Sequence, residues 1–265
     1  MPKQDLAFQI PVLNAAGMLG YAPDFRRHPQ IHHLGGFITN PVSRLPRSPA
    51  ESRTAARFPG GALIHTGFPN PGLKAVIRQH ARSWQQPSIP VILHLMVEHA
   101  AGLDECLRML DTVDGLSGLE LSFSPGLTAD EILECAELAA REWPVVIELD
   151  SRPGERLLPR LAGCDIAAVC SAPPRGVLPV NGESEKQLLS GGRIYGPGVF
   201  PPAMYWVQQA VCVGLPVIAA GGIYSWQEAR QFLRAGALAV KLDTVLWSGG
   251  ISFPAEWSRD HHLTA

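Results

Sequence analysis

The sequence predicts a (β/α)8 barrel, an α/β fold, formed by one domain that spans residues 1–265. Its length is typical of one such barrel. It also contains eight short apolar segments, most of them followed by a helical pattern. Near-continuous apolar strands of this kind belong to a parallel sheet that is covered on both faces. An open doubly wound sheet is the alternative, and it is disfavoured because no G-x-G-x-x-G motif follows the first strand.

The clearest single unit lies near the carboxyl end of the chain. It consists of a strand, a glycine turn, a helix and a second strand, at 216–220, 221–222, 225–235 and 238–242. Ser225 stands three residues before Glu228, which is the spacing of a helix capping box. A βαβ unit of this length predicts two parallel strands with a right-handed crossover. Its glycine turn then lies at the carboxyl end of a strand, where ligands bind in barrels of this kind.

The other elements follow in chain order. We expect the eight strands at 9–15, 36–39, 90–96, 118–122, 143–149, 166–170, 216–220 and 238–242. We expect helices at 23–27, 70–84, 102–113, 129–142, 154–161 and 201–213, with Asn70 and Thr128 as caps of the second and fourth. Residues 62–66 form one more apolar run. The stretches 43–61 and 172–200 are rich in proline and glycine, so we expect long surface loops there.

Composition excludes several classes of protein. Hydrophobic residues make up 46% of the chain and charged residues 17%, which is typical of a globular protein. A net charge of −2 gives no electrostatic reason to expect nucleic acid or an anionic membrane as a partner. The chain has no long apolar run and no signal-peptide core at its start, so we expect a cytoplasmic protein. The five cysteines are scattered, which predicts neither a disulfide framework nor a structural zinc site.

Six segments at the predicted strand ends carry a resemblance to one family. They are PVLNAAG at 11–17, GGFITN at 35–40, HTGFPNPG at 65–72, GLELSFSP at 118–125, the glycine-rich segment 192–201, and residues 220–223 with 235–237 and Thr244. In this order they resemble the dihydroorotate dehydrogenase family, in particular its soluble class 1 members. The resemblance implies an FMN-dependent oxidoreductase of pyrimidine metabolism, a flavoprotein that holds FMN at the carboxyl mouth of the barrel. It also implies a homodimer, or a hetero-oligomer with a related barrel.

The resemblance assigns roles to individual residues. FMN would contact Ala15, Ala16, Gly17, Thr39, Asn40, Ser122, Glu148, Ser171, Gly196, Gly221, Gly222, Asp243 and Thr244. A small-molecule substrate would contact His65, Gly67, Phe68 and Asn70. The catalytic candidates are Ser124 as base, together with Asn40 and Glu148. A glycine pair before a helix suits a phosphate, although the tight turn alone would also require it.

The chain departs from the family pattern where the chemistry takes place. Asn40 and Glu148 stand at positions where the family has lysines near the flavin, and Asp243 precedes Thr244 where the family has glycine. Ile64 and Ser122 replace asparagines that bind substrate. These replacements speak against oxidation of dihydroorotate itself.

Three explanations remain open. The chain is a flavoenzyme with an altered substrate, or a catalytically degenerate barrel that acts without FMN as a partner or regulatory subunit, or a barrel with a new site built from the substituted polar residues. Four of these, His65, His94, Glu148 and Asp243, could face one cavity. We expect hydrogen-bonded histidines there and no metal site. Glu148 needs a partner if it is buried, and Lys241 is one candidate unless strand alternation turns it outward.

Overall fold

The computed structural model describes residues 6–51, 54–85, 88–180 and 188–247. Its parallel strands are β1 (Val12–Asn14), β2 (Phe37–Ile38), β3 (Val42–Ser43), β6 (Val91–Val97), β7 (Gly118–Phe123), β8 (Val145–Leu149), β9 (Ala168–Ser171), β12 (Ile218–Ala220) and β13 (Ala239–Leu242). Its helices are α1 (Leu73–Trp84), α2 (Ala100–Leu110), α3 (Ala129–Ala140), α4 (Ser151–Leu161), α5 (Phe200–Cys212) and α6 (Trp226–Arg234). Short 3-10 helices lie at η1 (Pro29–His33), η2 (Pro197–Val199) and η3 (Thr244–Trp247).

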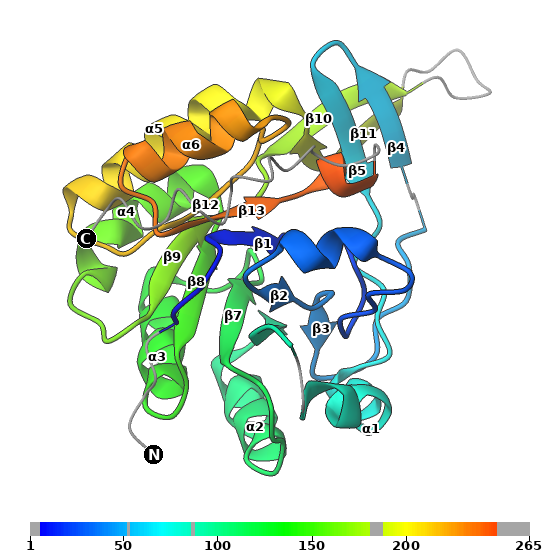
Figure 1. Ribbon diagram of the computed structural model, residues 1–265, viewed down its shortest axis with the longest axis vertical. Coiled ribbons are helices and arrows are strands. Elements are labelled where there is room, and N and C mark those ends of the chain that lie inside the picture. The colour runs from blue at the N-terminus through cyan, green and yellow to red at the C-terminus, as the bar shows by residue number, and fades with distance from the viewer. Residues whose placement is uncertain (1–5, 52–53, 86–87, 181–187, 248–265) are drawn as a thin grey trace.

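The parallel strands form two curled sheets (Figure 1). One has the order β1-β13-β12, and the other has the order β2-β6-β7-β8-β9 with β3 also beside β6. Single parallel bridges join the two sheets at both edges, between Leu13 and Gly36 and between Val169 and Val217. The predicted α/β class with parallel strands is confirmed, and each of the eight predicted strands has a counterpart.

Strand alternation divides the core into two regions. Leu13, Ile38, Ile92, Val146 and their neighbours face the inside of the curled sheets. The intervening residues of the same strands, such as Leu93 and Leu119, pack against the helices in a second and larger cluster. Both faces of the strands are therefore buried, which explains why the sequence shows near-continuous apolar runs instead of alternation.

The two expected loops are wrong in part, because each contains strands. β4 (Thr54–Phe58), β5 (Gly61–His65), β10 (Arg175–Val180) and β11 (Leu188–Tyr195) form an antiparallel sheet of order β10-β11-β5-β4. This side sheet, whose strand β11 is directly followed by η2, lies at the upper right in Figure 1. Its glycines permit close packing: a Cβ at Gly192 would lie 2.8 Å from the Ile64 carbonyl oxygen, and one at Gly196 would lie 2.4 Å from the Gly61 Cα. The glycines that led us to expect loops therefore allow close packing of strands in this sheet.

Local capping explains where several helices begin. Thr128 with Glu131 and Ser225 with Glu228 form capping boxes, so both predicted starts are confirmed. Asn70 is not the cap of α1, because this helix begins at Leu73 and the Asn70 Oδ1 atom accepts the Gly72 N–H at 3.0 Å.

The short helix expected at 23–27 is also absent from the described chain. A turn occupies that place, because Asp24 Oδ1 accepts the N–H groups of Arg26 and Arg27, and the 3-10 helix η1 follows it. None of the helices in the described residues has the length and apolarity that crossing a membrane requires.

Candidate functional site

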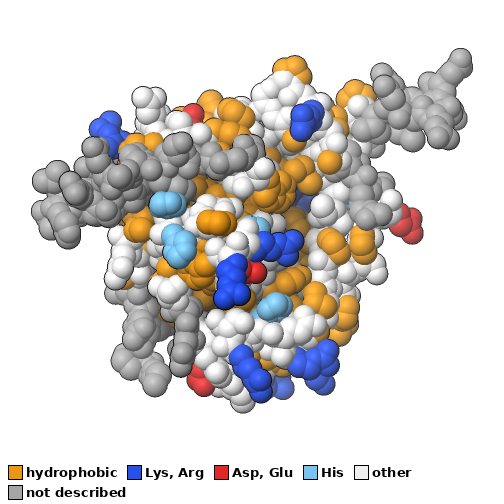
Figure 2. All heavy atoms as spheres, turned by 45° about the vertical axis from the view of Figure 1, so that its right-hand side comes forward, with side chains coloured by type: hydrophobic (Ala, Val, Ile, Leu, Met, Phe, Trp, Pro, Cys, Tyr) orange, Lys and Arg blue, Asp and Glu red, His pale blue; other side chains and the backbone are white. Residues whose placement is uncertain are grey.

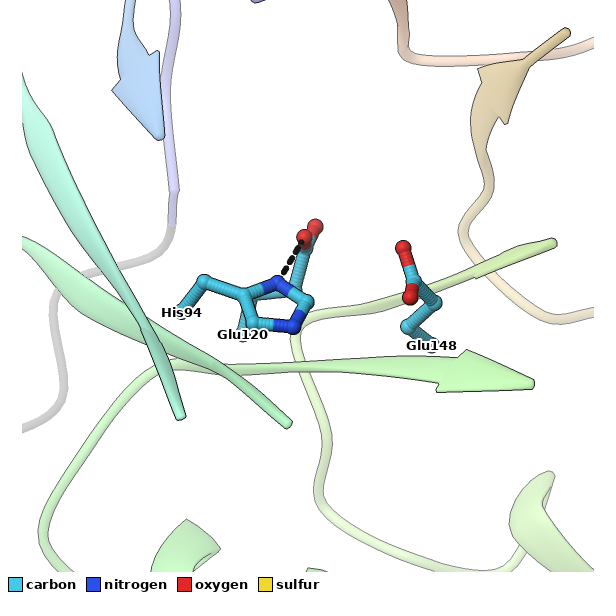
Figure 3. A group of neighbouring side chains, drawn as sticks. All are labelled: His94, Glu120 and Glu148. Carbon is cyan, nitrogen blue, oxygen red and sulfur yellow. Dashed lines mark hydrogen bonds and ion pairs between the residues drawn. The ribbon is translucent and has the colours of Figure 1, made fainter. Parts of the chain in front are cut away.

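Five polar side chains meet on the inner face of the strands, one layer above the apolar interior. They are His94 on β6, Glu120 on β7, Glu148 on β8, Cys170 on β9 and Lys241 on β13, and we call them the charged layer. The register aligns them, because His94 pairs with Glu120 across β6 and β7, and Glu148 pairs with Cys170 across β8 and β9. The three labelled side chains in Figure 3 come from adjacent strands and converge on one region.

Hydrogen bonds link the whole layer. The Lys241 Nζ atom lies 2.8 Å from Glu120 Oε2, 3.4 Å from Glu148 Oε2 and 3.1 Å from Cys170 Sγ. The second Glu120 oxygen lies 2.7 Å from His94 Nδ1, and His94 Nε2 lies 2.8 Å from the Ser122 hydroxyl oxygen. Glu148 therefore has the buried partner that its position requires, and that partner is Lys241, which points inward.

The charges in this layer stabilise one another. Burial acts to raise the pKa of Glu120, but Lys241 and His94 outweigh it and lower this pKa to about 2. Burial acts to lower the pKa of Lys241, whereas Cys170, Glu120 and Glu148 raise it well above its ordinary value. Burial raises the pKa of the Cys170 thiol. Glu120 is therefore a carboxylate and Lys241 an ammonium at neutral pH.

Three of these residues could in principle hold a metal ion. One ligand atom each from His94, Glu120 and Glu148 lie within 4.8 Å of one another. However, Lys241 already contacts both carboxylates and supplies the positive charge that they need. The expectation of no metal site therefore stays a prediction, supported by this competition for the carboxylates.

A cavity of about 340 Å³ opens above the charged layer, between the carboxyl ends of the parallel strands and the side sheet. We call it the mouth cavity. Its lining includes eight of the residues predicted to bind or react: Ala15, Ala16, His65, Gly67, Phe68, Ser122, Ser124 and Glu148. Its size is at the lower end of the range for small-molecule sites. On the face in Figure 2, basic and histidine side chains gather near the centre among hydrophobic ones.

Ion pairs surround this cavity. Arg193 on β11 and Arg175 on β10 both pair with Asp150, which directly follows β8, and Arg175 Nε lies 3.0 Å from it. Arg47 pairs with Glu98 at 3.0 Å. Burial acts to raise the pKa of Asp150, but the two arginines lower it. The two pairs with Asp150 attach the side sheet to the carboxyl end of β8.

Other predicted site residues have structural roles outside the mouth cavity. The Thr39 hydroxyl oxygen accepts the His94 N–H at 3.0 Å, and Asn40 Oδ1 accepts the Gly20 N–H at 3.1 Å. Asn70 is buried against Ser43, with Asn70 Nδ2 donating to the Ser43 hydroxyl oxygen at 3.0 Å. Gly17 has a positive φ of 87°, which a turn after β1 requires.

The residues of the predicted phosphate site are divided between two cavities, and Gly196 and Thr244 line one of about 430 Å³ beside Tyr224. Ser171, Gly221 and Asp243 line an inner cavity of about 40 Å³, which also borders Glu148 and Lys241. A Cβ at Gly221 would lie 2.8 Å from Val199 Cγ1, and one at Gly222 would lie 2.3 Å from the Phe200 amide nitrogen. Both glycines have positive φ, 103° and 75°. Glycine is required at both positions by the turn and by the close approach of Val199 and Phe200, where η2 ends and α5 begins.

Asp243 occupies the donors that a phosphate would use. Its buried carboxylate accepts the N–H groups of Thr244 and Val245, and the Thr244 hydroxyl donates to Asp243 Oδ1 at 3.1 Å. The same hydroxyl lies 2.6 Å from the Tyr224 hydroxyl. Burial raises the pKa of Asp243 to about 6, against these donors. The described residues at Asp243 therefore do not fit the phosphate group of FMN, and Gly196 directly follows β11 beside Gly61.

One residue of the site, Glu120, was not predicted from the sequence, and it is fully buried at the centre of the charged layer. Tyr195 on β11 is buried in the wall of the mouth cavity. Period-two alternation could have found Glu120, because Ser122 two residues later was predicted to face the ligand. The position of Tyr195 depends on the side sheet, which the sequence did not reveal.

Comparisons with known proteins give relatives of similar length. No family model matches the chain. A protein of Thermodesulfovibrio yellowstonii is 27% identical over 257 residues, 91% of this chain and 85% of that protein. One of Desulforudis audaxviator is 28% identical over 263 residues, 90% of this chain and 83% of that protein. Both are described as the catalytic subunit of dihydroorotate dehydrogenase B (NAD(+)).

A solved structure supports the same relationship at the level of the fold. The dihydroorotate dehydrogenase of Eimeria tenella, in complex with ferulenol, matches with a TM-score of 0.70 over 92% of this chain and 78% of that one. Its sequence identity of 16% limits that likeness to the fold. With the curated relatives, it confirms the resemblance of this chain to the dihydroorotate dehydrogenase family, as a divergent relative.

Proposed function

We propose that this protein is a dihydroorotate dehydrogenase-like barrel that binds a small organic molecule in the mouth cavity and does not bind FMN in the way of the family. The buried carboxylate of Asp243 carries this proposal, because it accepts hydrogen bonds from the backbone N–H groups of Thr244 and Val245, which a flavin phosphate would need. Two like charges about 4 Å apart cost roughly 4 kcal/mol at an effective dielectric constant of 20. The packing of Gly221 against Val199 and of Gly222 against Phe200 accounts for both glycines without a phosphate.

The proposal includes a closed eight-stranded barrel formed by the two parallel sheets. The bridges Leu13–Gly36 and Val169–Val217 support closure at both seams. At the first seam, Asn14 takes the place of a strand residue: its side chain donates to the Ile38 carbonyl at 2.6 Å and accepts the Ile38 N–H at 3.0 Å. Closure would make the charged layer one of the layers that fill such a barrel.

Within this site, Glu148 is the residue that we assign to the ligand. Its side chain is 13% exposed and lines both the mouth cavity and the inner cavity. Lys241 holds it from below at 3.4 Å. Ser124 lines the same cavity, but no hydrogen bond from a described base activates its hydroxyl, so the geometry gives it no support as the reactive group.

The second candidate function is an FMN-dependent oxidoreductase with an altered substrate. The names of the curated relatives favour it, since they describe catalytic subunits of a dehydrogenase. In that case Ala15, Ala16 and Ser122 would face the flavin, because they line the mouth cavity. The word "subunit" also favours assembly with another chain, which fits either candidate, including a barrel that acts as a partner without FMN.

Flavin titration separates the two candidates. Purified protein is titrated with FMN and with riboflavin, which lacks the phosphate, while flavin fluorescence and the absorption spectrum are recorded. We expect colourless protein that takes up neither flavin at micromolar concentrations. Asp243→Gly, which restores the family residue, removes the buried carboxylate, and the exposed change Asp130→Gly is its control. Stoichiometric uptake of FMN by the wild type would refute the proposal and establish the flavoprotein.

A further inference from the structure

Ser122, His94 and Glu120 form a continuous hydrogen-bonded chain that ends in the mouth cavity. Ser122 Oγ lies 2.8 Å from His94 Nε2, and His94 Nδ1 lies 2.7 Å from Glu120 Oε1. Ser122 and His94 both line the cavity, whereas Glu120 is fully buried beneath it. A nucleophile bonded to a base, and a base bonded to an orienting carboxylate, is the arrangement of a catalytic triad.

The protonation states in this chain suit the same chemistry. Glu120 is ionised, so both its oxygens accept hydrogen bonds and His94 must donate from Nδ1. That tautomer leaves Nε2 as an acceptor for the Ser122 hydroxyl proton. Lys241 holds the other Glu120 oxygen at 2.8 Å, so the carboxylate cannot turn away from the imidazole. Lys241 therefore fixes Glu120, and Glu120 in turn fixes the orientation of the His94 imidazole.

The strands fix these groups before any ligand binds. Glu120 and Ser122 are two residues apart on β7 and face the same side, and His94 lies on the neighbouring strand opposite Glu120. The backbone N–H of His94 is also held by the Thr39 hydroxyl at 3.0 Å. Sites on strands hold their geometry more precisely than sites on loops.

The cavity also offers a donor for a developing negative charge. Tyr195 is 8% exposed and lines the mouth cavity, and its hydroxyl makes no hydrogen bond to another described residue. Strand alternation puts it on the same face of β11 as Arg193, which reaches Asp150 at the end of β8. Burial raises the pKa of its phenol, so the hydroxyl stays protonated and can donate. A buried donor of this kind suits the carbonyl oxygen of an ester or amide.

We propose that Ser122 is a nucleophile, with His94 as its general base and Glu120 and Lys241 as positioning residues, and that the mouth cavity accepts small uncharged esters or amides for hydrolysis. Ser122 Oγ bonds to the acyl carbon while His94 Nε2 takes the hydroxyl proton. His94 then gives this proton to the departing alcohol or amine. Water, activated by His94, attacks the acyl-serine, which releases a carboxylic acid and restores the serine. This inference rests on the proposed function, since it requires a mouth cavity that is free of flavin.

The test uses the full-length protein and a fluorophosphonate probe, which phosphonylates an activated serine irreversibly with loss of fluoride. Labelling is located by peptide mass spectrometry, and hydrolysis of p-nitrophenyl acetate is followed alongside. We expect one labelled residue, Ser122, and a loss of labelling and of hydrolysis by at least about 100-fold in Ser122→Ala and His94→Gln. Ser117→Ala, at the opposite end of β7, is the control and should behave as the wild type.

The outcomes are separable. If the wild type is not labelled, or if Ser122→Ala is labelled and hydrolyses the ester at the wild-type rate, the inference is overturned. Circular dichroism confirms that each variant is folded. Glu120→Gln removes the carboxylate that fixes the tautomer of His94, so the pH profile of labelling should shift. A purely structural role of Glu120 would leave this pH profile unchanged. Flavin uptake and serine labelling are measured separately, so failure of this inference is distinguishable from failure of the proposed function.

Discussion

Replacing Lys241 by methionine tests the account of the charged layer. Lys241 and Glu120 are both buried, and their charged atoms lie 2.8 Å apart. Methionine has a similar length but no charge, so Glu120 and Glu148 would lose their cation. Removal of one partner from a buried ion pair costs about 3–5 kcal/mol of stability. Lys241 and His94 lower the pKa of Glu120 against the effect of burial, so the ionised carboxylate stabilises the folded state.

The pH dependence gives the sign of the effect. In the wild type, Glu120 has a lowered pKa, so its contribution is present above its ordinary pKa and is lost as the pH falls towards 2. In Lys241→Met, burial is no longer opposed by the lysine, so the pKa of Glu120 should lie above its ordinary value. Protonation of Glu120 would then remove the unpaired buried charge from the variant. The difference in unfolding free energy between the wild type and the variant should therefore become smaller as the pH falls from 7 to 5.

Urea unfolding, followed by tryptophan fluorescence at pH 7 and pH 5, measures both quantities. The double variant Lys241→Met/Glu120→Gln should be less destabilised than the sum of the single variants by at least about 1 kcal/mol, because it removes both charges. Lys74→Met, on the exposed face of α1, should change stability by less than about 0.5 kcal/mol. Additive losses, or a difference that does not narrow at pH 5, would refute the reasoning.

Three further predictions concern the rest of the site and the barrel seam. Asp243 has a raised pKa in the folded state, so its ionisation lowers the stability of the fold as the pH rises from about 4 to about 6. The complete loss amounts to about 3 kcal/mol. Asp243→Asn should remove this loss, which unfolding experiments at pH 4 and pH 7 can measure. Gly222→Ala should cost more than 3 kcal/mol in urea unfolding, because the Cβ would lie 2.3 Å from the Phe200 nitrogen at a φ of 75°. Asn14→Ala should cost about 2–4 kcal/mol, because it leaves the buried N–H and C=O groups of Ile38 unpaired, and hydrogen exchange should increase at that N–H.

Local sequence signals were sufficient for the elements of the parallel sheets. Capping boxes such as Thr128 with Glu131 depend on three or four neighbouring residues, so sequence alone fixes where α3 begins. The side sheet has no such local signal. β11 pairs with β5 through contacts between Arg193 and Ile64, which are far apart in sequence, and its glycines have the composition of a loop. Pairing with the distant strand β5 therefore determines the structure of this segment, although its local composition predicts a loop.

The candidate site was predictable in part for the same reason. Glu148 stood out because a carboxylate in an apolar strand needs a partner. The partner stayed open, because a strand that is buried on both faces has no polar face to show which side chains point inward. Lys241 faces the interior with Ala239, two residues earlier on β13. The structural reason for Gly221 and Gly222 could be recognised only once Val199 was placed against the first and Phe200 against the second.

The charged layer couples the stability of the fold to the chemistry of the proposed site. Glu120 has two oxygens, one bonded to Lys241 and one to His94, so the residue that neutralises the interior also orients the imidazole. A change at Lys241 should therefore reduce both stability and serine reactivity. Ser122 contributes one hydrogen bond, to His94, so Ser122→Ala should remove reactivity while stability falls by no more than about 1.5 kcal/mol. If the layer were merely a buried hydrogen-bond network, neither variant would affect labelling, because there would be no reactive serine to lose.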